Sequence, residues 1–169
     1  MTSKQTLRQT LGAFATGVAI ASAYDADGQP VGLTVNAFNS LSLDPPLILW
    51  CLRRYSGAAP VFLQADHFAV QILSHQQLDM CRLFASPGQD DRKRAQFNQR
   101  CAKAPLIGGT AAWLVCRNLR SYKEGDHLIF IGEVVETYRA DSGLPLKFWQ
   151  GTFYQTQTLQ VSDFDDGAL

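Results

Sequence analysis

The pattern of hydrophobic and polar positions predicts two β-hairpins, one toward each end of the chain. Residues 16–24 and 31–35 are runs of apolar and small side chains that flank a turn rich in Asp and Gly. Residues 111–122 and 127–138 are strand-like in the same way, and Gly125 between them can supply the positive φ of a tight turn. We therefore expect these four runs to be paired antiparallel strands.

Three further segments have the character of strands. Residues 47–52 form a short, continuous apolar run, which is typical of a strand buried on both faces, and Pro46 fixes where it begins. Residues 67–73 alternate as a half-buried strand does. Residues 146–159 carry an aromatic strand pattern, and the acidic tail at 163–166 is expected to be frayed.

Helical periodicity is confined to three short segments. Ser3 can cap an amphipathic helix that ends near Gly12. Residues 58–65 and 76–84 have the character of helices, the second with the 3.6-residue spacing of an amphipathic helix. Residues 86–100 combine Pro, Gly and charged side chains with little apolar content, so we expect either a mobile loop that covers a ligand or a solvated connection.

About six or seven strands at short spacing, with two or three helices between them, predict a mainly β fold, a closed or nearly closed β-barrel with helical insertions. The 169 residues are enough for one good hydrophobic core and few for two. No repeat, linker or low-complexity tract divides the sequence. We expect a single domain over residues 1–169, with its core at about residues 6–159.

Charge and composition narrow the classes of function. Fifteen basic residues balance fifteen acidic ones, so no net field attracts a nucleic-acid backbone or an anionic membrane. No apolar run approaches the roughly 18 to 20 residues of a membrane span, and the first residues lack the profile of a signal peptide. The expectation is a soluble, cytoplasmic protein that binds neither nucleic acid nor a membrane.

The cysteines, histidines and glycines of the sequence do not form the common motifs of metal sites, nucleophilic catalysis or dinucleotide binding. The four cysteines are scattered without a CxxC pair, so we expect reduced structural thiols, and no short spacing with the three histidines predicts a metal site. Neither a G-x-S-x-G nucleophile elbow nor a G-x-G-x-x-G dinucleotide fingerprint occurs. His127 follows a predicted hairpin tip, where its ring could project into a site or cap the turn.

Five blocks of the sequence are specific when they are taken together. They are Phe14-Ala-Thr-Gly-Val18, Gly32-Leu-Thr-Val-Asn-Ala-Phe-Asn-Ser-Leu-Ser-Leu-Asp-Pro-Pro46, Phe68-Ala-Val-Gln-Ile-Leu73, Gly125-Asp-His127 and Ile131-Gly-Glu-Val134. In this order they resemble the flavin reductase-like family, and the resemblance extends from about residue 6 to residue 155. It implies the fold of that family, the FMN-binding split barrel.

The resemblance also implies a flavin site made from two strand ends and a basic residue. Residues 34–37 match the stretch that runs beside the isoalloxazine ring in the family, and residues 51–56 match the one that holds the ribityl chain and phosphate. Of the neighbouring Arg92, Lys93 and Arg94, the first is assigned to the phosphate. The implied cofactor-binding residues are Thr34, Val35, Asn36, Ala37, Cys51, Leu52, Arg53, Ser56 and Arg92.

Two departures from the family pattern concern the polar edge of the flavin ring. Ala37 stands where a serine is frequent, and Asn39 stands where Ser or Thr is usual. Because the loss of one side-chain hydrogen bond weakens binding, the sequence leaves open whether flavin is a bound prosthetic group or an exchangeable substrate.

His127 matches the family histidine that faces the nicotinamide side of the flavin. The resemblance therefore implies that it is the catalytic residue and positions nicotinamide C4 over flavin N5. The implied activity is hydride transfer from NADH or NADPH to FMN or FAD, with both choices left open. The implied partners are a second copy in a homodimer and a separate flavin-dependent monooxygenase that receives reduced flavin.

Two other functions stay open on the same barrel, because a fold does not fix a function. One is a flavin-binding or electron-carrying module without NAD(P)H reductase activity, against which the Gly-Asp-His sequence argues. The other is a pyridoxamine phosphate oxidase, which is disfavoured because the matched blocks belong to the reductase branch.

Overall fold

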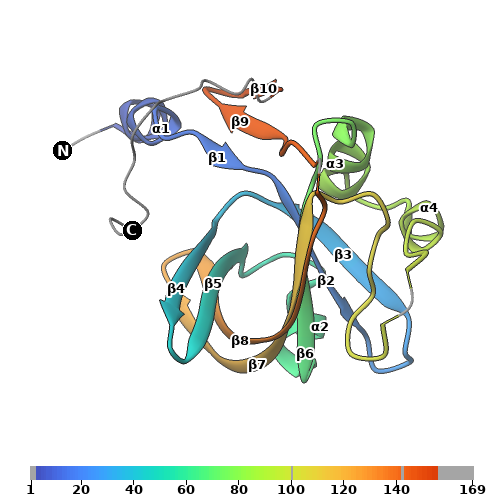
Figure 1. Ribbon diagram of the computed structural model, residues 1–169. Helices are drawn as coiled ribbons and strands as arrows, with labels where there is room; N and C mark the ends of the chain where they lie inside the picture. Colours follow the sequence, from blue (N-terminus) through green and yellow to red (C-terminus); the bar gives the residue numbers. More distant parts are fainter. Residues whose placement is uncertain (1–2, 100, 142, 156–169) are drawn as a thin grey trace.

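A computed structural model describes residues 3–99, 101–141 and 143–155 as antiparallel strands, with one short helix before the first strand and three between later strands (Figure 1). In chain order the elements are α1 (Lys4–Gly12), β1 (Thr16–Gly17), β2 (Ala19–Tyr24), β3 (Pro30–Val35), β4 (Phe38–Leu43), β5 (Pro46–Arg53), α2 (Ala59–Gln64), β6 (His67–Ile72), α3 (Leu78–Ala85), α4 (Asp90–Arg94), β7 (Ala112–Glu124), β8 (His127–Arg139), β9 (Lys147–Trp149) and β10 (Thr152–Tyr154).

Seven strands form one antiparallel sheet in the order β3-β2-β6-β7-β8-β5-β4, and β1, β9 and β10 form a small second sheet. Figure 1 shows the large sheet curled into a barrel, with the small sheet beyond one end of it. The two outermost strands, β3 and β4, are consecutive in the chain and are joined through Asn36 and Ala37 alone. The predicted fold class, a mainly β barrel with helical insertions, is confirmed.

One predicted strand, residues 16–24, is divided between the two sheets. The backbone N–H of Val18 donates to the carbonyl oxygen of Leu146, and the Val18 carbonyl accepts from the N–H of Leu73. The backbone hydrogen bonds of Val18 thus belong to neither strand, and Val18 marks the break between them. On one side of it β1 pairs with β9, and on the other side β2 pairs with β3 and β6.

The predicted aromatic strand near the end of the chain is a tight hairpin instead. β9 and β10 are joined at Gln150 and Gly151, which both have positive φ, +48° and +79°. A single strand was predicted because Phe148 and Phe153 belong to one apolar pattern, but their rings meet across the hairpin at 5.1 Å. Residues 156–159 and the acidic tail at 163–166 lie outside the described residues.

The prediction that residues 47–52 are buried on both faces is wrong. Ile48, Trp50 and Leu52 are buried, whereas the alternate residues of β5 are only half-buried. The physical reason is that a strand of an antiparallel barrel turns one face to the core and the other outward. β4 was not predicted: its Ser40-Leu41-Ser42-Leu43 run alternates over four residues only, and the structure leaves Leu41 and Leu43 exposed.

The helices α1, α2 and α3 begin and end within about two residues of their predicted bounds, and the Ser3 hydroxyl caps α1 by accepting from the Thr6 N–H at 3.0 Å. The segment 86–100 was predicted to be a loop throughout, but it contains α4. This helix has acidic residues in its first turn and basic residues in its last, as the helix dipole favours. Within the described ranges, no helix is long and apolar enough to cross a membrane.

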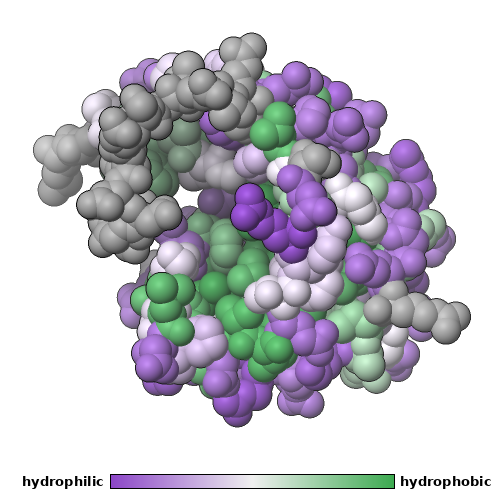
Figure 2. All heavy atoms as spheres, in the orientation of Figure 1, coloured by the Kyte–Doolittle hydropathy of each residue, from purple (hydrophilic) through white to green (hydrophobic). Residues whose placement is uncertain are grey.

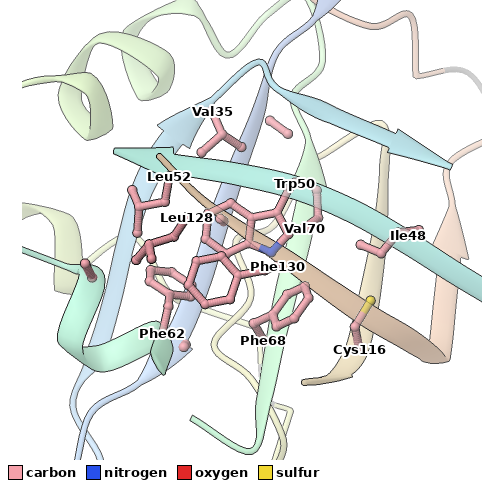
Figure 3. Packing of buried hydrophobic residues seen from close by; sticks show 14 residues of the cluster. Val35, Ile48, Trp50, Leu52, Phe62, Phe68, Val70, Cys116, Leu128 and Phe130 are labelled. Atoms are coloured by element: carbon pink, nitrogen blue, oxygen red, sulfur yellow. The ribbon is translucent and has the colours of Figure 1, made fainter. Parts of the chain in front are cut away.

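Aromatic and aliphatic side chains together fill the inside of the barrel (Figure 3). Trp50 of β5 stacks on Phe130 of β8 with ring centroids 4.7 Å apart. The ring of Phe62 from α2 meets the Trp50 ring edge-on, with centroids 4.9 Å apart. Phe68 of β6 lies 5.7 Å from Trp50. All four side chains are fully buried, so α2 and three strands are held together by one aromatic cluster.

Gly132 of β8 gives the sharpest test of this packing. A Cβ atom at this position would overlap the ring of Phe68 and lie 2.9 Å from the Cβ of Cys116. We expect Gly132→Ala to lower the free energy of unfolding by about 1–3 kcal/mol, because overpacking forces neighbours off their rotamers. Urea denaturation measures the change. Gly17→Ala, where nothing lies within 4 Å, is the matched control and should be near neutral; equal losses in both variants would contradict this account.

Candidate active site

A cavity of about 590 Å3 lies between β3, the turn before α2 and the segment that links α3 to α4. Two other hollows, of about 380 and 750 Å3, have no predicted site residue in their walls. The cavity is lined by Pro30–Thr34, Ser56–Ala58, Val61, Phe84–Gly88, Asp90, Lys93 and Arg94.

Gly32 of β3 allows the segment after α3 to lie close against the barrel. A Cβ atom there would lie 2.9 Å from ring atoms of both Phe84 and Phe97. These two rings meet edge-to-face with centroids 5.5 Å apart. The bare backbone of Gly32 therefore seats an aromatic pair that holds both ends of the segment carrying α4, which fixes this wall of the cavity.

Of the predicted site residues, Thr34 and Ser56 line this cavity. The Thr34 hydroxyl donates to the carbonyl oxygen of Cys81 in α3 at 2.7 Å, so its proton is already used within the protein. The Ser56 hydroxyl accepts from the N–H of Ala58 at 3.3 Å, which leaves its own proton free to donate. Ser56 therefore supplies the available hydroxyl donor of the pair.

The predicted residues at the ends of β3 and β5 meet through their backbones. The N–H of Cys51 donates to the carbonyl oxygen of Ala37 at 2.9 Å, and Asn36 and Ala37 are exposed. The side chains of Val35 and Leu52 are buried in the core, so a ligand at this corner could contact only their backbone atoms. Cys51 is half-buried, and burial raises the pKa of its thiol, which stays protonated at neutral pH.

Arg92 lies away from this cavity. Its guanidinium Nη1 donates to the side-chain oxygen of Gln89 at 2.5 Å, and it lines a separate surface hollow beside α4. Lys93 and Arg94 line the cavity instead. The sequence prediction chose among these three residues without knowing that they lie on a helix. The order of acidic and then basic residues at 90–94 was the signal that could have indicated α4.

His127 begins β8 and is the cross-strand partner of Arg53 in β5. Its Nδ1 lies 2.7 Å from Oδ1 of Asp126. The hydrogen bond from His127, and then its charge, hold the pKa of the Asp126 carboxyl below its ordinary value of 3.8, and Arg53 adds a smaller effect. Because an ionised carboxylate can only accept, Nδ1 carries the proton and Nε2 of a neutral ring is left as an acceptor.

The arrangement suits binding and positioning better than nucleophilic chemistry. Ser56, Lys93 and Arg94 offer donors to an anion such as a phosphate at the cavity. His127 pairs with Arg53 at the end of β5, and residues 53–56 lead from that point to Ser56 in the wall of the cavity. Burial raises the pKa values of the Cys51, Cys81 and Cys116 thiols, the last to about 12, so none of these is an activated nucleophile.

The chain is similar to known proteins over most of its length. The family model described as a flavin reductase like domain matches residues 11–157. FMN reductase (NADH) SmoA of Agrobacterium fabrum is 40% identical over 89% of this chain and 85% of its own. The reductase component of a flavin-dependent trigonelline monooxygenase from Acinetobacter baylyi is 35% identical over 88% of this chain, which spans 47% of that protein.

Solved structures include one with the same extent. The Streptomyces globisporus C-1027 NADH:FAD oxidoreductase SgcE6, in complex with NAD and FAD fragments, superposes with a TM-score of 0.81 at 32% identity and covers 95% of this chain and 96% of its own. The similarity therefore includes every element that lines the cavity and both strands that meet at His127.

The Asp126 to His127 hydrogen bond predicts a pH-dependent contribution to stability. A carboxyl whose pKa is lower in the folded state stabilises that state above the pKa of the unfolded chain, and this effect is lost as the pH falls through the folded pKa. We expect Asp126→Asn to unfold at slightly lower urea concentration than the wild type at neutral pH, and the difference to shrink below pH 3.8. A difference that persists at the lowest pH would contradict the assignment.

Proposed function

The chain belongs to the family of flavin reductase-like domains, and we propose that it is an NAD(P)H:flavin oxidoreductase that works at the site described above. When bound, flavin supplies the redox chemistry, since N5 accepts a hydride from nicotinamide C4 and the nucleotide is oxidised by two electrons. NADH is the donor named for SmoA and for the S. globisporus enzyme, one with FMN and the other with FAD.

The observation that carries the proposal is that residues 53–56 connect a hydrogen-bond donor for a phosphate, Ser56, to Arg53, the cross-strand partner of His127. Ser56 lies in the wall of the cavity, three residues after Arg53, and Arg53 pairs with His127 across the sheet. Lys93 and Arg94, which also line the cavity, add positive charge. A long ligand with a phosphate at one end and a reactive ring at the other fits this order of donors.

We assign the phosphate of flavin to Ser56 and Arg94, with Lys93 as a second cation. The Lys93 ammonium already donates to the carbonyl oxygen of Ser86 at 2.6 Å, whereas Arg94 has only a 3.9 Å contact with exposed Asp91. The guanidinium of Arg94 is therefore the freer donor and can form two parallel hydrogen bonds with a phosphate. Arg92, the residue that the sequence favoured, is not part of this assignment.

The ring of flavin is assigned to the backbone at residues 34–37 and at Cys51 and Leu52. Because the side chains of Val35 and Leu52 are in the core and the Thr34 hydroxyl is bonded to α3, the ring would be recognised by main-chain groups. This explains how Ala37 can replace a serine without removing the site.

His127 is assigned the role of positioning the nicotinamide. Asp126 holds the Nδ1 proton, so Nε2 can accept a hydrogen bond from the carboxamide of the nucleotide. The hydrogen bond places the hydride donor and does not transfer a proton. The expected benefit is the orientation of the two reacting rings.

We also propose a single domain that forms a homodimer in the cytoplasm and supplies reduced flavin to a separate monooxygenase. Figure 2 shows apolar side chains gathered over the region that β4 and β5 occupy in Figure 1, where Leu41 and Leu43 are exposed. The proposed location in the cytoplasm is supported by the four free cysteines, because thiols stay reduced in that compartment. The trigonelline enzyme named above is such a reductase component. A monomer in sedimentation equilibrium would contradict the dimer.

Anaerobic stopped-flow mixing of FMN-loaded or FAD-loaded protein with NADH or NADPH tests the activity and the role of His127. We expect rapid bleaching of the oxidised-flavin absorbance in the wild type and bleaching that is slower by about 100-fold in His127→Ala, since misplaced donors cost rate. Flavin affinity should be unchanged, and His75→Ala is the control. No bleaching with any pair would favour a flavin-binding module without reductase activity.

The phosphate assignment is tested by a comparison of two neighbouring arginines. We expect Arg94→Ala to raise the dissociation constant for FMN by about tenfold, because a charge-assisted hydrogen bond is lost. Arg92→Ala should leave it unchanged. Flavin fluorescence titrations measure both, and riboflavin, which has no phosphate, should bind the two variants alike. A larger effect of Arg92→Ala would overturn the assignment.

A further inference from the structure

An arginine and a tyrosine form an exposed stacked pair next to the proposed active site. The guanidinium carbon of Arg54 lies 4.6 Å from the centroid of the Tyr55 ring. Tyr55 is 80% exposed, more than any other aromatic side chain among the described residues. We refer to these two residues as the Arg54–Tyr55 platform. Since Arg54 covers one face of the ring at most, the platform offers a flat aromatic surface to solvent.

The platform is held in place by backbone hydrogen bonds. The turn that carries it is closed by the N–H of Ser56, which donates to the carbonyl oxygen of Arg53 at 2.9 Å. The N–H of Arg54 donates to the carbonyl oxygen of Asp126 at 3.0 Å, and Nη1 of Arg54 reaches the carbonyl oxygen of Gly125 at 3.4 Å. The platform is therefore tied to the hairpin tip that carries His127.

The guanidinium of the platform is not held in an ion pair. In the part of the chain that the structure describes, neither Arg53 nor Arg54 forms an ion pair. A guanidinium has five N–H donors, and Arg54 uses one of them in a long hydrogen bond. Donors for an anion thus lie beside a surface on which a nucleobase can stack.

We propose that the Arg54–Tyr55 platform binds the adenosine diphosphate half of a dinucleotide, with the adenine on the Tyr55 ring and the diphosphate on Arg54. The inference rests on the proposed function, because that function brings a dinucleotide to His127. Both NAD(P)H and FAD contain this half, and the platform lies between the residues assigned to each: Ser56 on the flavin side and His127 on the nicotinamide side. The structure thus assigns the chemistry of the subsite, and the experiment distinguishes the two sources.

The first test is the binding of ADP alone, which needs neither flavin nor turnover. Isothermal titration calorimetry should give a dissociation constant for ADP that rises by about tenfold in Tyr55→Ala, since stacking on an aromatic ring is lost. Tyr55→Phe keeps the ring and should bind as the wild type does. Tyr122→Ala, which removes an exposed tyrosine from β7, is the matched control.

The second test compares dinucleotides with the corresponding mononucleotides. If the bound half belongs to NADH, Tyr55→Ala lowers kcat/KM for NADH by about tenfold and leaves kcat/KM for reduced nicotinamide mononucleotide with FMN as in the wild type. If it belongs to FAD, the variant binds FAD more weakly and FMN normally. Either result supports the proposal.

The proposal is overturned if Tyr55→Ala changes none of three quantities: the affinity for ADP, kcat/KM for NADH relative to reduced nicotinamide mononucleotide, and the affinity for FAD relative to FMN. It is also overturned if the variant weakens the binding of mononucleotides and dinucleotides equally. Failure of the proposed function is a separate result. In that case the wild type oxidises neither reduced nicotinamide nucleotide with FMN or FAD, while the ADP titration still reports on the platform.

Discussion

The pairing of β5 with β8 is the interaction on which most of the structure depends. Its register runs without a break from Leu47 opposite Glu133 to Arg53 opposite His127. In the middle of the ladder, Trp50 and Phe130 are direct partners and their stacked rings form the centre of the core. A slip of one residue would turn Trp50 outward, so burial of the core fixes the register and, with it, the residues that meet at the end of the ladder.

The site is therefore made of strand ends whose positions the core determines, together with one helix seated on Gly32. Few side chains of the proposed site are available to a ligand, because Val35 and Leu52 belong to the core and Thr34 is bonded to α3. The proposed flavin site thus relies on main-chain atoms, one hydroxyl and a few cations, a small set of contacts that would suit an exchangeable flavin. This agrees with the proposed delivery of reduced flavin to a separate monooxygenase.

The hairpin between β7 and β8 connects the proposed nicotinamide and diphosphate sites. Asp126 holds the ring of His127 with its carboxylate and the backbone of Arg54 with its carbonyl oxygen. The histidine proposed to position the nicotinamide and the exposed platform are thus both bonded to Asp126, one through its side chain and the other through its backbone. Because these contacts lie at the end of a ladder of thirteen-residue strands, they are held by the most extensive pairing in the sheet.

The barrel class, the two hairpins, three of the helices and the candidate histidine could all be predicted from the sequence, because period-2 runs, turn residues and family blocks are local features. Tertiary structure alone decided which face of β5 is buried, where residues 16–24 change sheets, and that His127 meets Arg53. It also placed Arg94, and not Arg92, in the wall of the cavity, since the two residues lie about 200° apart around a helix. The helix α4 has five residues and is too short to show a helical period in the sequence. The register of β5 against β8 depends on residues some eighty positions apart in the chain.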